Sequence, residues 1–247
     1  MLFAHGFGCD QNMWRFVAPA FEDRYQTILF DSVGAGGSDL SAYSFEKYST
    51  LEGYADDIVE IGHALQIKNG IFIGHSVSAM TGLIAVKKAP GMFSSIVMVG
   101  PSPCYIDSGD YIGGFTRPQI DELLALLDDN YLAWSATMAP AIMGNSDRPA
   151  LGDELTNSFC RTDSAIAKHF ARTTFLSDWR HILPDTRVPS LILQCSDDVI
   201  APLDVGHYMN RQMPQSTLVV MKATGHCPNL SAPEETIRAI KEFLTAN

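Results

Sequence analysis

Long apolar runs and clusters of basic residues are both missing from this chain. No window approaches the uncharged stretch of about 20 residues that a transmembrane helix needs. The 28 acidic residues outnumber the 17 basic ones and give a formal net charge of −11. No run of lysine or arginine is present to contact nucleic-acid phosphates. We therefore expect neither a membrane nor a nucleic acid as a partner.

Motifs for metals and cofactors are also lacking. No H-x-x-H or H-E-x-x-H pair occurs, and the glycine-rich segment 31–38 does not have the G-x-G-x-x-G spacing of a nucleotide loop. We expect a structural turn at that segment, and neither a metal nor a cofactor. The cysteines are odd in number, scattered and without C-x-x-C spacing, which predicts reduced thiols and a cytoplasmic location. They are Cys9, Cys104, Cys160, Cys195 and Cys227.

The pattern that is present alternates short β-branched runs with helical stretches. A chain of 247 residues, 46% of them hydrophobic, is suited to one large α/β domain. The alternation covers residues 1–100 and 185–247, whereas residues 101–184 show four helical patterns and no strand-like run. We predict a mostly parallel sheet flanked by helices, with residues 101–184 forming a helical lid over the carboxyl ends of the strands. Ligands bind at that edge of open α/β sheets.

The expected elements can be stated by range. Strands are predicted at 1–4, 27–31, 71–73, 95–99, 190–194 and 217–221, and a short helix at 11–21. Three S/T-x-x-E/Q patterns predict helix starts with a capping box. They begin at Ser49, Thr116 and Ser231.

The stretch around Ser76 carries the clearest chemical signal. A β-branched and aromatic run ends at Gly74-His75-Ser76, and small residues then continue at helical spacing. A serine at such a sharp strand-to-helix turn is held in a strained conformation with its hydroxyl exposed, as a nucleophile requires. The flanking positions must be small because the helix folds back on the strand. Gly74 meets this requirement, and Ser78 stands where the G-x-S-x-G pattern has its second glycine.

Ser76, Asp198 and His226 follow three predicted strands in the chain order Ser…Asp…His. That order is typical of the α/β-hydrolase fold. A serine hydroxyl needs an imidazole to remove its proton, and a carboxylate to orient that imidazole. Asp197 is an alternative to Asp198. We prefer Asp198 because it lies four residues before Pro202, a spacing that α/β-hydrolases favour.

A glycine-flanked turn, His5-Gly6-Phe7-Gly8, directly follows the first strand. Such a loop supplies one N–H of the oxyanion hole in serine hydrolases, and the residue after the nucleophile supplies the other. We therefore assign the N–H groups of Phe7 and Val77 to this task. His5 and His75 are expected to shape turns, and His63, His169, His181 and His207 to lie on the surface. Cys9 and Cys227 are expected near the pocket, as packing residues.

Several segments resemble one group of α/β-hydrolases, which contains the bacterial stress-signalling hydrolase RsbQ and the plant strigolactone and karrikin receptors. The matching segments are 7–11, 17–22, 98–105, 111–115, 189–195 and 225–228. Over essentially the whole chain the resemblance is strongest to RsbQ, whereas the elbow 74–80 is more like that of the plant receptors. The resemblance implies a V-shaped four-helix lid, a hydrophobic pocket above the serine, and slow hydrolysis of small esters or lactones. For RsbQ it also implies signalling through a protein partner.

One departure from the group concerns the start of the chain. Relatives carry two strands before the strand that ends at His5, and here Met1 almost begins that strand. Without them, the strand at 27–31 would be an apolar sheet edge, which invites pairing with another chain. We expect that residues of the natural protein precede Met1, and the alternative is an edge covered by a partner.

Two functions follow as hypotheses. The first is a serine hydrolase for a small hydrophobic ester or lactone, with an apolar pocket that includes Phe7, Trp134, Met138, Phe159 and Phe175. The second is a ligand-sensing signalling protein in which turnover is incidental. A serine at position 76 argues against epoxide hydrolases and dehalogenases, which have aspartate there. Carbon–carbon bond hydrolases use the same triad, so that class stays open.

Overall fold

The computed structural model describes residues 1–246, in which six strands form one sheet in the order β2-β1-β3-β4-β5-β6. Every neighbouring pair is parallel. Parallel strands all end at the same edge of a sheet, so the loops that follow them lie near one another. The strands are β1 (Leu2–Ala4), β2 (Ile28–Leu29), β3 (Gly70–His75), β4 (Phe93–Val99), β5 (Ser190–Asp197) and β6 (Ser216–Thr224).

Helices connect the strands and cover the sheet. Helices α1 and α2 pack against each other, and α2 also contacts β3 and β4, whereas α7 and α9 pack against β5 and β6. The bounds of these helices are α1 (Leu51–Ala64), α2 (Val77–Lys88), α7 (Leu203–Gln212) and α9 (Pro233–Ala246), with α8 (Pro228–Ser231) between β6 and α9. None of the helices within residues 1–246 has both the length and the apolar character that crossing a membrane requires.

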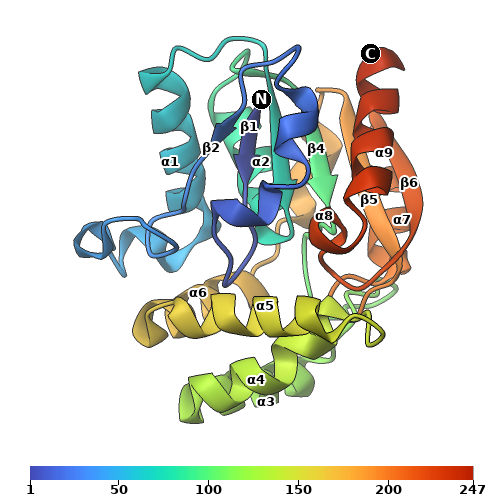
Figure 1. The fold of residues 1–247 in the computed structure, drawn as a ribbon. Helices are drawn as coiled ribbons and strands as arrows, with labels where there is room; N and C mark the ends of the chain where they lie inside the picture. Colours follow the sequence, from blue (N-terminus) through green and yellow to red (C-terminus); the bar gives the residue numbers. More distant parts are fainter. Residues whose placement is uncertain (247) are drawn as a thin grey trace.

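Four further helices are inserted between β4 and β5. Figure 1 shows them as a layer across one end of the sheet, the end toward which the β4 arrow points. Their apolar residues are buried against one another and against the carboxyl ends of the strands. The helices are α3 (Arg117–Asp129), α4 (Tyr131–Met143), α5 (Pro149–Arg161) and α6 (Ser164–Phe175). The predicted parallel α/β architecture is therefore confirmed, with helices covering the edge where the site residues were expected.

Two of the predicted elements near the start of the chain are wrong in extent. The helix expected at 11–21 is two 3₁₀ segments, Gln11–Trp14 and Ala18–Phe21. A continuous α-helix would need a hydrogen bond from the N–H of residue 19 to the carbonyl of residue 15, and Pro19 has no N–H to donate. The strand expected at 27–31 is only Ile28–Leu29, and its residues are half-buried. It pairs with β1 alone among the strands of residues 1–246.

The three capping predictions have different outcomes. Thr116 and Gln119 form the predicted capping box at the start of α3. The box expected at Ser49 is wrong, because Thr50 precedes α1 and the Ser49 hydroxyl donates to the Glu46 carbonyl instead. The box expected at Ser231 is also wrong. Ser231 ends α8 and Pro233 begins α9, a position that suits proline because it has no N–H to leave unpaired.

Gly74 lets α2 approach β3 closely. A Cβ at this position would lie 2.5 Å from the Ser78 carbonyl oxygen and 2.8 Å from the Ala79 nitrogen, both of which are backbone atoms of α2. No side-chain rotation can relieve such contacts. The spacing between β3 and α2 therefore depends on the absence of a side chain here.

Replacing Gly74 with alanine should separate β3 from α2. We expect Gly74→Ala to lower the free energy of unfolding by about 1–3 kcal/mol or more, the range for overpacked interiors. Urea denaturation monitored by circular dichroism measures this change. Gly37→Ala is the matched control, because its Cβ would lie 3.6 Å from the nearest atom, Asp31 Oδ2. Equal stability of the two variants would contradict the packing argument.

Candidate active site

Ser76 lies between β3 and α2 with a positive φ of 56°. This conformation is costly for a residue with a side chain, and such outliers concentrate at functional sites. The Ser76 N–H donates to the Val99 carbonyl on β4 at 2.8 Å, which fixes the turn to the sheet. The side chain is buried and lines a cavity under the inserted helices. The sharp strand-to-helix turn that the sequence predicts is thus present.

The side chains of Ser76, His226 and Asp198 form one chain of hydrogen bonds. Ser76 Oγ lies 2.7 Å from His226 Nε2, and His226 Nδ1 lies 2.7 Å from Asp198 Oδ2. When Nδ1 carries the imidazole proton, it donates to the carboxylate and leaves Nε2 free to accept from the hydroxyl. All three residues are buried. The structure therefore brings together residues that lie 28 and 150 positions apart in the chain.

The surroundings of Asp198 keep it ionised. Burial by itself would raise its pKa, but the charge and hydrogen bond of His226 and two backbone N–H groups outweigh this and hold the pKa below its usual value. The backbone donors are Ile200 at 2.8 Å and Ala201 at 3.1 Å, and both reach Oδ1. A buried carboxylate that accepts this many hydrogen bonds stays charged and fixed in orientation.

Asp197, the alternative to Asp198, has different surroundings. It is exposed at the end of β5, and its carbonyl accepts from the Gly225 N–H at 2.7 Å. Its main chain therefore helps to hold the loop that carries His226, while the carboxylate of Asp198 contacts the imidazole. The geometry favours Asp198 for the third position.

The loop after β1 lies directly against the Ser76 turn. A Cβ on Gly6 would be 3.3 Å from the Ser76 Cβ, and Phe7 lines the same cavity as Ser76. Among the hydrogen bonds within residues 1–246, neither the Phe7 nor the Val77 N–H donates to another group of the chain. Val77 is the first residue of α2, where N–H groups have no partner inside the helix.

Ser78, which replaces the second glycine of the elbow pattern, also joins these two segments. Its hydroxyl donates a short hydrogen bond to the His5 carbonyl. The imidazole of His5 is itself fixed, because its Nδ1–H donates to the Gly6 carbonyl and its Nε2 accepts from the Ser32 N–H. A serine is thus accommodated here by a contact that ties the loop after β1 to α2.

The cavity over Ser76 is small and mainly apolar. Its volume is about 30 Å³, room for about two water molecules. Of the five residues predicted for the pocket, three line this cavity: Phe7, Phe159 and Phe175. The Phe7 ring lies 5.6 Å from that of Phe159 and 6.3 Å from that of Phe175, so the three form one aromatic wall.

The structure departs from the pocket prediction at Trp134 and Met138, which are not among the lining residues. Trp134 stacks behind Phe159, with ring centroids 5.9 Å apart, and Met138 is half-buried within the core. The residue of α4 that reaches the cavity is Ile142, one turn further along the same helical stripe. Periodicity identifies the buried face of a helix, but it cannot say which turn of that face meets a cavity.

Sequence reasoning missed Tyr105, Thr174 and Ile200, which also line the cavity. The Tyr105 phenol is fully buried, which raises its pKa, and a hydrogen bond with the Ser76 side chain opposes that rise. The Thr174 hydroxyl is buried and has no hydrogen-bond partner among the residues that the structure describes. Tyr105 lies in one of the segments that carried the family resemblance, which was the available signal.

The remaining candidates for chemistry near Ser76 are poorly suited to it. Burial raises the pKa of the Cys9 thiol to about 12 and that of Cys227 well above its usual value, so both stay protonated and weakly nucleophilic. Of the histidines expected on the surface, His169 is half-buried against Tyr43, with Nδ1 2.8 Å from the phenol oxygen. Within residues 1–246, no three histidine, cysteine or carboxylate side chains gather as a metal site would require.

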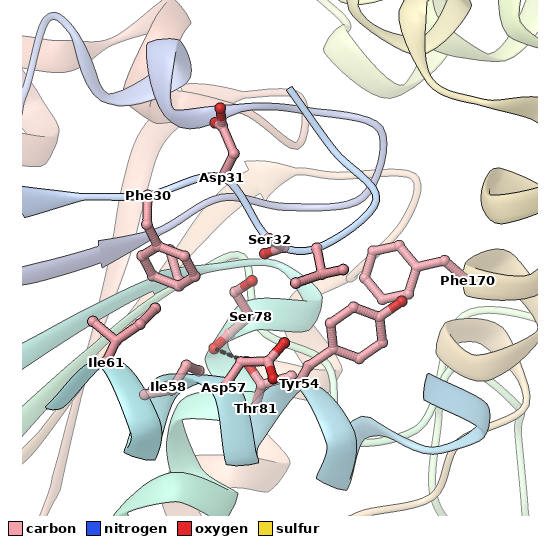
Figure 2. Close-up of a pocket in the computed structure, with 12 residues that line it drawn as sticks. Phe30, Asp31, Ser32, Tyr54, Asp57, Ile58, Ile61, Ser78, Thr81 and Phe170 are labelled. Atoms are coloured by element: carbon pink, nitrogen blue, oxygen red, sulfur yellow. Dashed lines mark hydrogen bonds between the residues drawn. The ribbon is translucent and has the colours of Figure 1, made fainter. Parts of the chain in front are cut away.

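A second cavity, of about 40 Å³, lies between α1, α2 and the segment that follows β2. Figure 2 shows Asp57, Ser78 and Thr81 among its lining residues, while the side chain of Asp31 points away from them. Its hydroxyls serve local structure, because Thr81 donates to the Ser78 carbonyl and Ser78 to that of His5. Asp57 accepts from Tyr48 and Lys47. None of the residues within 1–246 that line this cavity is a histidine, so the arrangement found at Ser76 is not repeated here.

Comparison with known proteins agrees with this geometry. Residues 1–239 match the family model described as "Alpha/beta hydrolase family". The chain belongs to the alpha/beta hydrolase family. A solved hydrolase from Oleispira antarctica is 44% identical to it, with a TM-score of 0.96 over 100% of this chain and 90% of that one. An enol-lactonase from Burkholderia xenovorans LB400 has a TM-score of 0.86 at 18% identity, covering 99% and 90% of the two chains, and shows the fold alone.

Curated alpha/beta hydrolases among its relatives confirm the resemblance to the plant receptor group. The chain is 37% identical over 252 residues to "Karrikin insensitive 2 receptor IA" of Petunia hybrida, covering 100% of this chain and 92% of the relative. It is 36% identical over 245 residues to "Strigolactone esterase D14" of Arabidopsis thaliana, covering 99% and 91%.

His75 should make the stability of this alpha/beta hydrolase depend on pH. Burial, followed by the neighbouring His226, lowers the pKa of His75 to about 3, against about 6.5 in an unfolded chain. Between these values the unfolded state binds the extra proton. The free energy of unfolding should therefore fall as pH drops below about 6.5, by up to about 1.4 kcal/mol per pH unit from this residue.

Urea unfolding between pH 4 and 8 tests this expectation. In His75→Gln the slope of stability against pH should be smaller than in the wild type between pH 4 and 6.5. Above pH 7 the two proteins should differ by a constant amount, because the histidine is neutral in both states there. Identical slopes below pH 6.5 would show that His75 does not titrate as its burial implies.

Proposed function

We propose that this protein is a serine hydrolase that acts on a small hydrophobic ester or lactone. The observation that carries the proposal is the continuous chain of 2.7 Å contacts from Ser76 through His226 to Asp198. A serine hydroxyl that is bonded to an imidazole, itself oriented by a buried carboxylate, is an activated nucleophile. Relatives whose names describe esterases support the same reaction class.

The proposed reaction has two halves. Ser76 Oγ attacks the substrate carbonyl while His226 Nε2 accepts its proton, and Asp198 stabilises the imidazolium that forms. The tetrahedral oxyanion accepts hydrogen bonds from the Phe7 and Val77 N–H groups. His226 then protonates the leaving alcohol, which leaves an acyl group on Ser76. Water, deprotonated by the same imidazole, releases the acid and restores the serine.

The substrate class follows from the cavity and the relatives. Aromatic and aliphatic side chains surround Ser76, with few polar groups to recognise a charged substrate. A cavity of about 30 Å³ is too small for a drug-sized ligand, whose pockets are about 300–1,000 Å³. Only a short acyl group can approach without movement, and anything larger requires the inserted helices to shift. We therefore propose that residues 101–184 act as a lid.

A ligand sensor is the second candidate function. Its support is the 37% identity to proteins named karrikin insensitive 2 receptors, with nearly the whole length aligned. In this reading, occupancy of the cavity repositions the lid for a signalling protein partner, and hydrolysis is slow. The same side chains serve both functions, so the rate of turnover decides between them.

Substitution of Ser76 tests the first proposal. We expect Ser76→Ala to reduce kcat for p-nitrophenyl acetate by at least about 10³-fold, because the two thiols that line the cavity, Cys9 and Cys227, stay protonated and cannot replace the serine. Ser94→Ala is the control, since that serine is exposed at the amino end of β4 and its hydroxyl donates to the carbonyls of Asn69 and Gly70 at the start of β3, away from the cavity. Retained turnover in Ser76→Ala would refute the serine mechanism. Slow turnover by the wild type, together with tight ligand binding to both the wild type and Ser76→Ala, would favour the sensor.

Enlarging the cavity should change acyl-chain preference. Phe159→Ala removes part of the aromatic wall of the cavity. The kcat/KM for p-nitrophenyl octanoate should therefore rise relative to that for the butyrate by about 10-fold or more, where 10-fold is the lower end of the range for apolar pocket contacts. Leu126→Ala is the control, because that leucine of α3 is 57% exposed and outside the cavity. An unchanged ratio in Phe159→Ala would show that the acyl group binds elsewhere.

A further inference from the structure

The main chain of His226 is held from two sides. Its N–H donates to the Ile142 carbonyl near the end of α4 at 2.9 Å. Its carbonyl accepts from His75 Nε2–H, on the Ser76 turn, at 2.7 Å. One anchor therefore belongs to the sheet core and the other to the inserted helices. The main chain that carries the imidazole is thus hydrogen-bonded both to the Ser76 turn and to α4.

The segment that follows α4 is fastened to the loop carrying His226 by one side chain. Asn145 Nδ2 donates to the Met143 carbonyl at 2.9 Å and to the Thr224 carbonyl at 3.0 Å. These carbonyls belong to different segments, the end of α4 and the end of β6. Asn145 has a φ of 56°, a left-handed conformation that asparagine tolerates better than most residues. A single amide thus links the insertion to the residues just before His226.

The backbones of these segments are in direct contact at the same place. A Cβ on Gly225 would lie 1.9 Å from the Met143 carbonyl oxygen. The Gly225 N–H donates to the Asp197 carbonyl at 2.7 Å, so this glycine also joins the loop to the end of β5. With only hydrogen atoms on its Cα, Gly225 admits the end of α4 against the His226 loop.

Arg148 supports the Asn145 side chain from its other side. One guanidinium nitrogen donates to the Ser231 carbonyl at 2.7 Å, and another donates to Asn145 Oδ1. The amide of Asn145 is therefore fixed at its oxygen by Arg148 while its nitrogen bridges the two carbonyls. This arrangement resists the separation of α4 from the loop that follows β6.

We propose that Asn145 is a positioning residue, which couples the seating of α4 to the placement of the His226 imidazole. The cavity has a volume of only about 30 Å³, so entry of a substrate larger than a short acyl group requires the insertion to move. When α4 moves away, it pulls the His226 loop with it through Asn145 and the Ile142 carbonyl, and the Ser76–His226 hydrogen bond breaks. That hydrogen bond forms again when α4 returns. The inference rests on the proposed hydrolase and adds a residue that touches neither substrate nor reacting atoms.

The first test compares the two ends of α4. Asn145→Gly removes the bridge and keeps the left-handed backbone. We expect it to lower kcat for p-nitrophenyl acetate by about 10- to 100-fold, the scale for a misplaced catalytic group, with KM within about twofold of the wild type. Asn130→Gly is the matched control, because Asn130 caps the opposite end of the same helix through the Ala133 N–H. It should stay within about twofold in both constants.

A conservative variant removes only the donors. Asn145→Asp keeps the shape of the side chain and an acceptor for Arg148, but it cannot donate to the Met143 and Thr224 carbonyls. It should lose kcat as Asn145→Gly does, while its melting temperature remains near that of Asn130→Gly. Full activity in Asn145→Asp would overturn the proposal, and this variant decides the matter if Asn145→Gly does not fold.

A double-mutant cycle separates positioning from general damage. If Asn145 acts through His226, then adding Asn145→Gly to His226→Ala should cost no further activity in single-turnover cleavage. An equal loss in both backgrounds would overturn the inference. The proposed function fails by a different result, namely turnover that survives Ser76→Ala. Serine-dependent turnover with Asn145→Gly indistinguishable from Asn130→Gly would reject only the positioning role.

Discussion

The close approach of α2 to β3 is the constraint on which the site depends. Because Gly74 has no side chain, the main chain of Ser78 and Ala79 packs directly against it. The single residue left to reverse direction between strand and helix is Ser76, which adopts a positive φ and points its hydroxyl into the cavity. The N–H of Val77, the residue after this serine and the first of α2, has no hydrogen-bond partner within residues 1–246. The contact between Gly74 and α2 thus positions both the proposed nucleophile, Ser76, and one proposed oxyanion donor, the Val77 N–H.

The inserted helices complete the site through contacts with two separate loops. Ser158 of α5 donates to the Gly8 carbonyl at 2.7 Å, and Phe159 packs over the same glycine in the loop after β1. At the other end of the insertion, Ile142 accepts from the His226 N–H. The helices that roof the cavity therefore also support the loops that carry the proposed oxyanion donor and the imidazole. A cavity of about 30 Å³ fits this closed arrangement, in which access and alignment depend on the same contacts.

Much of the architecture could be predicted from local pattern. Strands β1, β3, β4, β5 and β6 were all identified, since buried parallel strands read as short β-branched runs between turn residues. The errors occurred where a sequence pattern for a helix start or a strand was overridden by a neighbouring residue or by a longer-range hydrogen bond. Thr50 rather than Ser49 precedes α1, and proline at position 233 rather than a serine cap starts α9. Edge strand β2 is shorter than its apolar sequence suggests because Asp31 turns away to bind Gln11 and Gly37.

The site residues show the same division between local and long-range information. The order Ser76, Asp198, His226 could be read from the chain, because each follows a strand and parallel strands deliver their loops to one edge. Whether Asp197 or Asp198 faces the imidazole depends on side-chain direction at the end of β5. That Ile142 rather than Met138 reaches the cavity depends on where α4 crosses it. The sequence determined the fold family and the types of side chain available for chemistry. Tertiary packing alone decided which of these side chains meet. Contacts such as that of Asn145 with Thr224 join segments far apart in the chain, and local sequence periodicity carries no information about such pairs.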